Sequence, residues 1–579
     1  MGVGVCAWLA ACGLGCVAGS AEGGAASKPV MVFPSRDDLA KLPTLPPLPE
    51  AFGTSDVPVD AWSFESPATT DGATYEDASP WGEIARELAK AHPSTTALSA
   101  SMRCTAQELA RFHVAKHAMP TESLRRFMAA RCGAASAAYA PAVWSVTLPT
   151  PTTDEELAPK ARDGFAKMLA ARLERGHHLL GVAAARDGQR VSIVAVDAQD
   201  EARLEPGSLS VDASRQVTLR GEVRGEFTQI GALINRGDVG TAPCVSDPTI
   251  KPPRFALTCT LASGDPFAWV EILGHRRDQL LLHELAEALV HEGDGSAITY
   301  APRHIGPPAP VAGTADFARA MLGGLNAVRT RAHLPALALA PEQSAENTRL
   351  AGTLLDAAVS GDDGTSNRGA IGLMAGWDVK GLVRNSTFYL SASPTNDATA
   401  WLDFALERPM GRSSLLDPDS RLIAIGPAIP PGGGALGAAV TTYALFGSDD
   451  HGAEATRLFQ RVAAARKARG VAPPVRVKAI DEMDAELARV AQDGKPAMTA
   501  LHAAMQAVVS RTGEGVQGWL YETNDLDRAD IPAPLLAPGV MQLMMGVTHH
   551  RAEGAAWGQY VVFVIAVGAR ATPGETASL

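Results

Sequence analysis

Apolar residues recur at helical spacing in the first third of the chain. The segment from Glu155 to Arg175 places four large apolar side chains on one helix face: Leu157, Phe165, Leu169 and Leu173. His178 to Val196 then predicts two strands joined at Asp187-Gly188, a typical hairpin turn. Because helical spacing already begins near Pro80, these patterns predict a helical and hairpin domain over residues 80–201.

Alternation of apolar and polar residues replaces this spacing in residues 202–275. Runs such as Gln216 to Leu219 are short and are separated by turn residues. Several short strands at close spacing predict a small β-sandwich of the immunoglobulin-like kind. Asp278 to His291 is predicted as a helix, and with the Pro-rich stretch after it forms a connection over residues 276–313.

The first 19 residues are mostly small and apolar, which is typical of an export signal, although no Lys or Arg precedes the apolar run. Within them Leu9-Ala10-Ala11-Cys12 resembles a bacterial lipobox, in which a peptidase cuts before the cysteine and the Cys12 thiol is diacylated. Acyl chains there anchor a protein to a membrane without spanning it. A plain signal peptide with incidental cysteines is the alternative, and a start codon further upstream stays open.

Residues 20–79 follow as a segment of low complexity. Up to about Asp60 it is rich in Ala, Gly, Ser and Pro and has few aromatic residues. Such a sequence buries too little apolar surface to offset its ordering entropy. We therefore expect a flexible tether that holds the folded part away from a membrane.

Four cysteines lie beyond the N-terminal region, in two local pairs: Cys104 with Cys132, and Cys244 with Cys259. An even number in an exported protein favours disulfides, and loops of this length each contribute roughly 3 kcal/mol. Four cysteines allow three connectivities, and four buried thiols are the alternative. We predict the two local pairs.

Composition and charge exclude some function classes. The 579 residues are enough for several domains, and the formal net charge is −12 with a pI of about 5.7. Because no long basic run occurs, we do not expect nucleic acid as a partner. No run of eighteen apolar residues follows the first twenty, so we expect no membrane-spanning helix.

A series of short motifs lies in a fixed order between Thr314 and Phe446. The motifs are Leu325-Asn326-Ala327-Val328-Arg329, Leu334-Pro335-Ala336-Leu337, Trp401, Leu415-Leu416-Asp417-Pro418, Ile425-Gly426 and Ala439-Val440-Thr441-Thr442-Tyr443. In this order and spacing the segment resembles the CAP superfamily of secreted cysteine-rich proteins. The resemblance covers less than a quarter of the chain and implies an α-β-α sandwich over residues 314–448.

The residues that this family uses in its cavity are replaced here. Arg384-Asn385 is the nearest fit to the family's Glu-Asn, and Gly411-Arg412 is the nearest fit to the His-Arg of bacterial members. No histidine occurs from Leu334 to Asp450. Because metal binding needs convergent imidazole or carboxylate donors, the resemblance implies a degenerate domain without a metal, a cofactor or a catalytic residue.

A candidate metal cluster lies outside this segment, in the predicted helix that ends at His291. His283, Glu287 and His291 would share one face of that helix at four-residue steps. The outer two would then lie about 12 Å apart along the axis, too far to share one ion easily. They are weak metal candidates, and we favour a solvated helix face.

One local pattern occurs three times: a strand with Gly, a polar turn and an apolar strand. It begins at Leu180-Gly181-Val182-Ala183, at Ile425-Gly426-Pro427-Ala428 and at Met545-Gly546-Val547-Thr548. The last lies in residues 449–579, which we predict to form an α/β domain. Three diverged CAP-like units and three unrelated hairpins both explain the pattern.

These features predict an α+β multidomain protein, exported and lipid-anchored at the outer membrane or cell surface. We expect a non-catalytic binding or scaffolding protein with a lipid, cell-wall or protein ligand at the envelope. One alternative is a hydrolase whose interdomain site joins carboxylates to histidines outside the CAP-like segment: His177, His283, His291 or His549. The other is a purely structural surface protein, which would have no ligand cavity.

Overall fold

The computed structural model shows a mixed α/β multidomain protein, which confirms the sequence prediction at that level. It describes residues 5–8, 33–44, 56–57, 62–64, 74–136, 139–148, 150, 152–174, 176–205, 209–276, 281–293, 299–300, 304–311, 313–393, 397–428, 436–447, 451–523, 525–527, 531–539 and 541–568. The lipidation predicted at Cys12 lies outside them. The chain divides into two compact units, Met1–Ala25 with Pro34–Met374 and Thr387–Thr442, and Ala26–Phe33 with Ala375–Ser386 and Tyr443–Leu579.

Three sets of four strands share one order. In each set the short first strand pairs in parallel with the third, the third lies beside the fourth, and the fourth lies beside the second. In spatial order the N-terminal sheet is β3 (Thr96–Leu98), β6 (His178–Asp187), β7 (Arg190–Gln199) and β5 (Tyr139–Thr147). The middle sheet is β16 (Ala338–Leu339), β18 (Ser420–Ala428), β19 (Leu436–Leu445) and β17 (Val383–Ser393). The C-terminal sheet is β20 (Val475–Arg476), β22 (Gln542–His550), β23 (Gln559–Val567) and β21 (Val516–Thr523).

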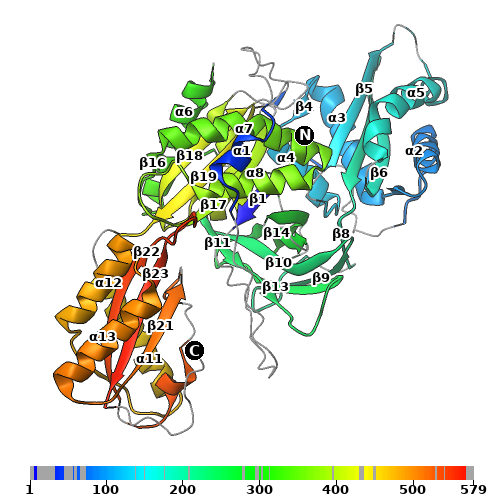
Figure 1. Ribbon diagram of the computed structural model, residues 1–579. Coiled ribbons are helices and arrows are strands. Elements are labelled where there is room, and N and C mark those ends of the chain that lie inside the picture. The colour runs from blue at the N-terminus through cyan, green and yellow to red at the C-terminus, as the bar shows by residue number, and fades with distance from the viewer. Residues whose placement is uncertain are drawn as a thin grey trace. The chain divides into compact units, whose positions relative to one another are not determined.

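Helices follow the same sequence around each sheet (Figure 1). One precedes the first strand, two lie between the first and second strands, and at least one helical segment lies between the second and third. Around the N-terminal sheet these are α2 (Pro80–Ala91), α3 (Ala100–Lys116), α4 (Glu122–Arg131) and α5 (Asp154–Leu173). Around the middle sheet they are α6 (Thr314–Arg331), α7 (Pro341–Ser360), α8 (Asp363–Ala375), α9 (Ala398–Glu407) and α10 (Pro409–Leu415). Around the C-terminal sheet they are α11 (His451–Ala468), α12 (Asp481–Asp493), α13 (Ala497–Thr512) and the 3-10 helix η1 (Ala533–Leu536). This shared order favours three diverged units over three unrelated hairpins.

Two further groups of strands lie between the N-terminal and middle sheets in the sequence and share one apolar core. The first is the sheet β8 (Ala202–Leu204), β9 (Gln216–Val223), β13 (Arg254–Thr260) and β12 (Val245–Ser246). The second comprises β11 (Gly240–Pro243), β10 (Phe227–Arg236), β14 (Phe267–Arg276) and β15 (Leu282–His291). Through β1 (Val5–Trp8) this second group continues into the middle sheet, so that nine strands form one sheet.

The helix predicted at Asp278 to His291 is wrong, because β15 occupies Leu282–His291 and pairs with β14 along its length. Residues 285–290 are all buried. A strand that is covered on both faces carries a continuous apolar run, which cannot be told from a buried helix by periodicity alone.

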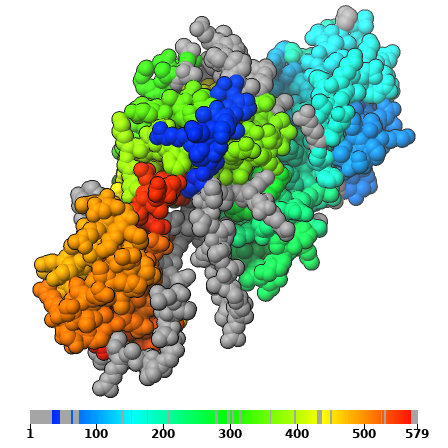
Figure 2. Space-filling model, viewed as in Figure 1, coloured from blue at the N-terminus to red at the C-terminus, as the bar shows by residue number. Residues whose placement is uncertain are grey.

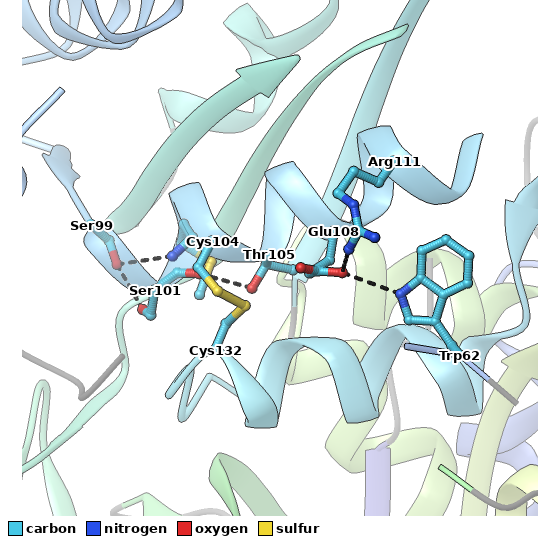
Figure 3. The surroundings of a disulfide bond; sticks show 9 residues. Trp62, Ser99, Ser101, Cys104, Thr105, Glu108, Arg111 and Cys132 are labelled. Carbon is cyan, nitrogen blue, oxygen red and sulfur yellow. Dashed lines mark hydrogen bonds and ion pairs between the residues drawn. A yellow bond between two sulfur atoms is a disulfide. The ribbon is translucent and has the colours of Figure 1, made fainter. Parts of the chain in front are cut away.

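Parts of the predicted tether pack against the folded chain. Leu39 of α1 (Arg36–Ala40) is buried, and its carbonyl accepts a hydrogen bond from Arg349 at 2.9 Å. Figure 3 shows Trp62 beside α3, where its indole N–H donates to buried Glu108 at 3.2 Å. The prediction of a flexible tether is therefore wrong for these stretches, since their few large apolar side chains are enough to dock them.

Both disulfides expected from the sequence are formed. Cys104 of α3 bonds to Cys132 at the end of α4, with their Cα atoms 5.5 Å apart (Figure 3). Cys244 bonds to Cys259 of β13, with their Cα atoms 4.5 Å apart, inside the core that the two groups of strands share. Each disulfide therefore ties together two elements of one local fold.

The C-terminal sheet lies between two layers of helices (Figure 1). Along β22, Met545 and Val547 face α11 and η1, whereas Met544 faces α12 and α13. This alternation follows from the two-residue repeat of a strand, and both faces of β22 are apolar because both are covered. The described residues of α11 to α13 lie together in the space-filling view, in orange (Figure 2).

Candidate functional site

The edge of the C-terminal sheet is a strand of only two residues. β20 pairs with β22 at Gln542 and Leu543. In the part of the chain that the structure describes, no strand lies beside Met545–Thr548 on that side. These four residues therefore present an uncovered backbone edge.

Backbone hydrogen bonds show which atoms face this edge. The N–H of Val477 donates to the carbonyl of Leu543 at 2.9 Å. In a strand the N–H and C=O of one residue point the same way, and those of the next residue point the opposite way. The backbone groups of Met545 and Val547 therefore face the same edge as those of Leu543.

A cavity of about 710 Å³ lies along this edge and is lined by β22, α11, α12 and the segment that follows β20. His451 lines it from α11, Leu487 and Gln492 line it from α12, and Lys478 lines it from the connecting segment. Ligand sites in proteins usually have volumes of about 300–1,000 Å³. The cavity is therefore large enough for a ligand of several residues.

In the other two sheets a helix backbone lies directly on the face of the third strand. A Cβ on Gly181 of β6 would lie 2.1 Å from the backbone N of Arg103 in α3. A Cβ on Gly426 of β18 would lie 2.2 Å from the carbonyl carbon of Asn347 in α7. These two glycines permit a helix backbone to rest directly on the strand, which leaves little room for a ligand.

Helix α12 stands further from its strand. A Cβ on Gly546 of β22 would first meet the side chain of Leu487, at 2.5 Å. In α7 the fourth residue, Ser344, accepts the N–H of Ile425 at 3.1 Å and so covers the edge. The fourth residue of α12 is Asp484, which lines the cavity. The cavity thus exists because a side chain, not the helix backbone, meets Gly546.

Charged side chains surround the apolar floor of the cavity. Arg476 and Lys478 line it, and Arg476 is oriented by a hydrogen bond from its Nη1 to the hydroxyl of Thr456 at 2.7 Å. Burial raises the pKa of Asp484, and the negative charge of Asp481 adds to this effect. The site therefore favours a ligand with an anionic group near the two cations.

Three potential metal ligands meet beside the cavity. His549 Nε2 lies 2.8 Å from Glu454 Oε2, and His451 Nδ1 lies 3.4 Å from the same oxygen. One donor atom of each residue lies within 4.8 Å of the others. Burial alone would raise the pKa of Glu454, but the hydrogen bonds from His549 and His451 outweigh it and hold the pKa below its usual value.

Sequence reasoning found only one member of this cluster. It named His549 among four histidines that an enzyme site would need, but it missed His451 and Glu454. The available signal was a His-x-x-Glu spacing at the start of a helix, whose partner lies 95 residues beyond Glu454. Of the other three histidines, His177 is exposed, and His283 and His291 lie on β15.

The weak metal candidates do not converge. A register shift at Leu285 places His283 and Glu287 on opposite faces of β15, and each four-residue step spans about 13 Å. His283 packs against the ring of Phe227, with ring centroids 6.4 Å apart. Neighbouring candidates are therefore too far apart to share an ion, whereas the solvated helix face that we favoured for them is wrong, because they lie on a strand and Glu287 is buried.

Glu287 belongs instead to a buried network with Glu271 and Glu284. Arg408 donates to Glu271 at 2.8 Å, lies 3.1 Å from Glu287 and contacts Glu284. Arg126 donates to Glu287 at 2.8 Å. Burial raises the pKa of Glu287 to about 7, against the opposing effect of Arg126. Because guanidinium groups already pair with these carboxylates, the network locks β14 and β15 to the helices beside them.

The positions that the resemblance aligns with the CAP cavity have structural contacts. Arg384-Asn385 stands near the start of β17. In α10 a Cβ on Gly411 would lie 1.9 Å from the carbonyl oxygen of Ala405, and Arg412 donates to the carbonyl of Gly237 at 2.8 Å. Gly411 and Arg412 therefore serve close packing and backbone hydrogen bonding.

No family model matches the chain, and no curated protein matches it significantly. Among the described helices, none combines the length and the apolar character that crossing a membrane requires. The cavity at β22 and the cluster beside it are therefore the strongest basis for a function.

Proposed function

We propose that this protein is an exported, lipid-anchored envelope protein that binds extended peptide segments without cleaving them. The ligand adds a strand to the C-terminal sheet, along the edge of β22 and inside the cavity. One observation carries the proposal: no described strand covers the backbone edge at Met545 and Val547, whereas Ser344 of α7 occupies the corresponding edge of the middle sheet.

Strand addition suits this edge for a physical reason. An unpaired edge offers alternating N–H and C=O groups, which a peptide backbone satisfies, while neighbouring pockets select its side chains. The four residues Met545–Thr548 span about 13 Å and accommodate roughly four ligand residues. Helices α11 and α12 flank the edge and shield it from the uncontrolled pairing that exposed edges invite.

The charged residues of the cavity further restrict the chemical class of the ligand. Arg476 and Lys478 line the cavity, and burial disfavours the charged form of Asp484. An acidic side chain or a terminal carboxylate of the peptide would pair with these cations in a partly water-excluded site. We therefore infer that the ligand is an acidic, extended segment of a protein or of a cell-wall peptide.

The envelope location and the CAP-like domain are further parts of the proposal. The lipobox at Cys12 and the two disulfides support export to an oxidising compartment. The motif order in residues 314–448 supports a degenerate CAP-like domain, and the repeated strand order extends that interpretation to three units. Cys12→Ser should move the protein from the membrane fraction to the soluble fraction.

An array of acidic, neutral and basic peptides of about ten residues tests ligand binding by the full chain. Val547→Pro removes an edge N–H and should weaken binding of the acidic hits at least about tenfold, whereas Val547→Ala should not. Lys478→Ala should also weaken binding, while Lys467→Ala on exposed α11 surface serves as the charge-matched control. Hits that bind Val547→Pro as tightly as the wild type would contradict strand addition.

A hydrolase is the second candidate, and one observation favours it: His451, Glu454 and His549 meet beside the cavity. Three protein donors with an open position are typical of catalytic zinc sites. Mass spectrometry of the array hits after incubation with zinc and the full chain separates the two functions. Intact peptides support binding alone, and cleavage that Glu454→Gln abolishes supports the hydrolase.

A further inference from the structure

The cluster beside the cavity draws its ligands from two elements that pack on each other. His451 and Glu454 stand three residues apart at the start of α11, so their side chains project on the same side of the helix. His549 reaches them from β22, against which α11 packs. The fold thus brings together two imidazoles and one carboxylate, although these residues do not form a local sequence motif.

The distances in this cluster suit a single ion. Donor atoms that lie about 2.0–2.2 Å from a tetrahedral zinc ion are roughly 3.3 Å from one another. The two histidine nitrogens lie 2.8 Å and 3.4 Å from Glu454 Oε2, and all three donors fall within 4.8 Å. An ion could therefore replace the present hydrogen bonds after small side-chain adjustments.

The three side chains are buried to different extents. The exposed fraction is 8% for His549, 18% for Glu454 and 39% for His451. The His549 ring is held by Phe446 and Tyr560, with ring centroids 4.5 Å and 5.1 Å away. Such packing fixes the inner ligand, while the more exposed His451 gives an ion access from solvent.

The partners of Glu454 distinguish this cluster from the buried network around Glu287. Both described ion-pair partners of Glu454 are histidines, which can release a proton and bind a metal. Glu287, by contrast, pairs with the guanidinium groups of Arg126 and Arg408. Arginine does not lose its proton in proteins and therefore occupies the place an ion would take.

We propose that His451, Glu454 and His549 bind a divalent transition-metal ion, with zinc as the best fit to their donor types. Two imidazoles and one carboxylate are ligands that zinc accepts readily, and three protein ligands leave a fourth position for water or another donor. His451 also lines the cavity, so the ion would lie next to a bound ligand. The proposal goes beyond peptide binding and can fail or succeed independently of it.

Calorimetric titration of the full chain with zinc chloride tests the site. We expect binding that His549→Ala and Glu454→Gln each weaken at least about 100-fold. His550→Ala is the matched control, because it changes the next residue of the same strand outside the cluster. His502→Ala, on the exposed face of α13, controls for adventitious binding by surface histidines.

A second variant and a second readout distinguish the loss of a zinc ligand from a failure of the variant to fold. His451→Ala changes a partly exposed residue at a helix start, so it should fold like the wild type and still lose zinc affinity. Cobalt should give visible absorption bands that Glu454→Gln removes. Absence of zinc binding at about millimolar metal, or wild-type affinity in both His451→Ala and Glu454→Gln, overturns the proposal. Peptide binding measured with a chelator present reports on the proposed function alone.

Discussion

Arg329 of α6 and Arg466 of α11 make the same hydrogen bond beside two different sheets of this chain. Arg329 Nε donates to the carbonyl of Pro335 at 2.7 Å, and Arg466 Nε donates to the carbonyl of Ala472 at 2.7 Å. In both cases the acceptor lies six residues beyond the arginine, and both side chains are fully buried. Each arginine lies in the last turn of the helix that precedes the first strand of its sheet.

The remaining N–H groups of these arginines strengthen the parallel. Arg329 donates to carbonyls at 415, 417 and 420, up to the first residue of β18, and Arg466 donates to carbonyls at 535, 537 and 539, just before β22. β18 and β22 are the third strands of their sheets. Shared strand order together with a shared buried side chain favours common descent of the middle and C-terminal units.

Replacing Arg466 by lysine should destabilise the C-terminal unit by about 3 kcal/mol. Lysine cannot reach all four carbonyls, and each buried acceptor left without a donor costs about 1 kcal/mol or more. Thermal unfolding followed by the fluorescence of the full chain measures the loss. Arg469→Lys, at an exposed position three residues further on, should change stability by less than about 0.5 kcal/mol. Equal effects of the two substitutions would contradict the role assigned to Arg466.

The two glycines at equivalent strand positions should respond differently to alanine. Gly426→Ala places its Cβ 2.2 Å from the backbone of Asn347, so α7 must move, at a cost of roughly 2–3 kcal/mol. Gly546→Ala meets the side chain of Leu487, which borders the cavity and can turn into it, so the cost should stay below about 1 kcal/mol. Denaturant unfolding measures the free energy of unfolding of both variants. Similar losses of stability would contradict the larger distance of α12 from its strand.

Removing either disulfide should lower stability by about 3 kcal/mol through the unfolded state. The closed segments span 28 residues for Cys104–Cys132 and 15 residues for Cys244–Cys259. Thermal unfolding of each double Cys→Ala variant, with and without reductant, measures the effect. A variant lacking both disulfides should be insensitive to reductant, and a wild type that is equally insensitive would contradict their formation.

Acidification should destabilise the compact unit that contains His283 and includes Pro34–Met374. Burial and the positive charge of Arg276 lower the pKa of His283 from 6.5 to about 4 in the folded protein. Between these values the unfolded chain binds a proton that the folded chain does not, so stability is lost as pH falls from 6.5 towards 4. The loss should reach about 2 kcal/mol.

Unfolding midpoints of the wild type and of His283→Gln, measured at pH 7 and pH 4.5, check this expectation. Glutamine stays neutral at both values, so the variant should lose less stability on acidification than the wild type. A variant that responds to pH in the same way as the wild type would show that His283 does not contribute.

The parts of the fold that were predictable from sequence are those with local signals. Cysteine spacing predicted both disulfides, and the shared Gly pattern at Gly181, Gly426 and Gly546 marked the third strand of each sheet. β15 was misread as a helix, because burial on both faces removes the alternation that identifies a strand.

The candidate site was less accessible to sequence reasoning than the fold. Glu454 and His549 are 95 residues apart, and nothing in the pattern of α11 indicates which strand lies against it. The cavity depends on what a Cβ at Gly546 would meet, the side chain of Leu487, which only the packed structure reveals. Tertiary convergence and helix placement therefore carry most of the functional information in this protein.

Residue-resolved amide hydrogen exchange of the full chain tests the central claim, an open edge that a peptide strand completes. In the free protein the amides of Met545 and Val547 should exchange much faster than those of Met544 and Gly546, which face β23. A saturating acidic peptide from the array should protect Met545 and Val547 selectively. Equally slow exchange of all four amides without peptide, or no added protection at saturation, would contradict the account.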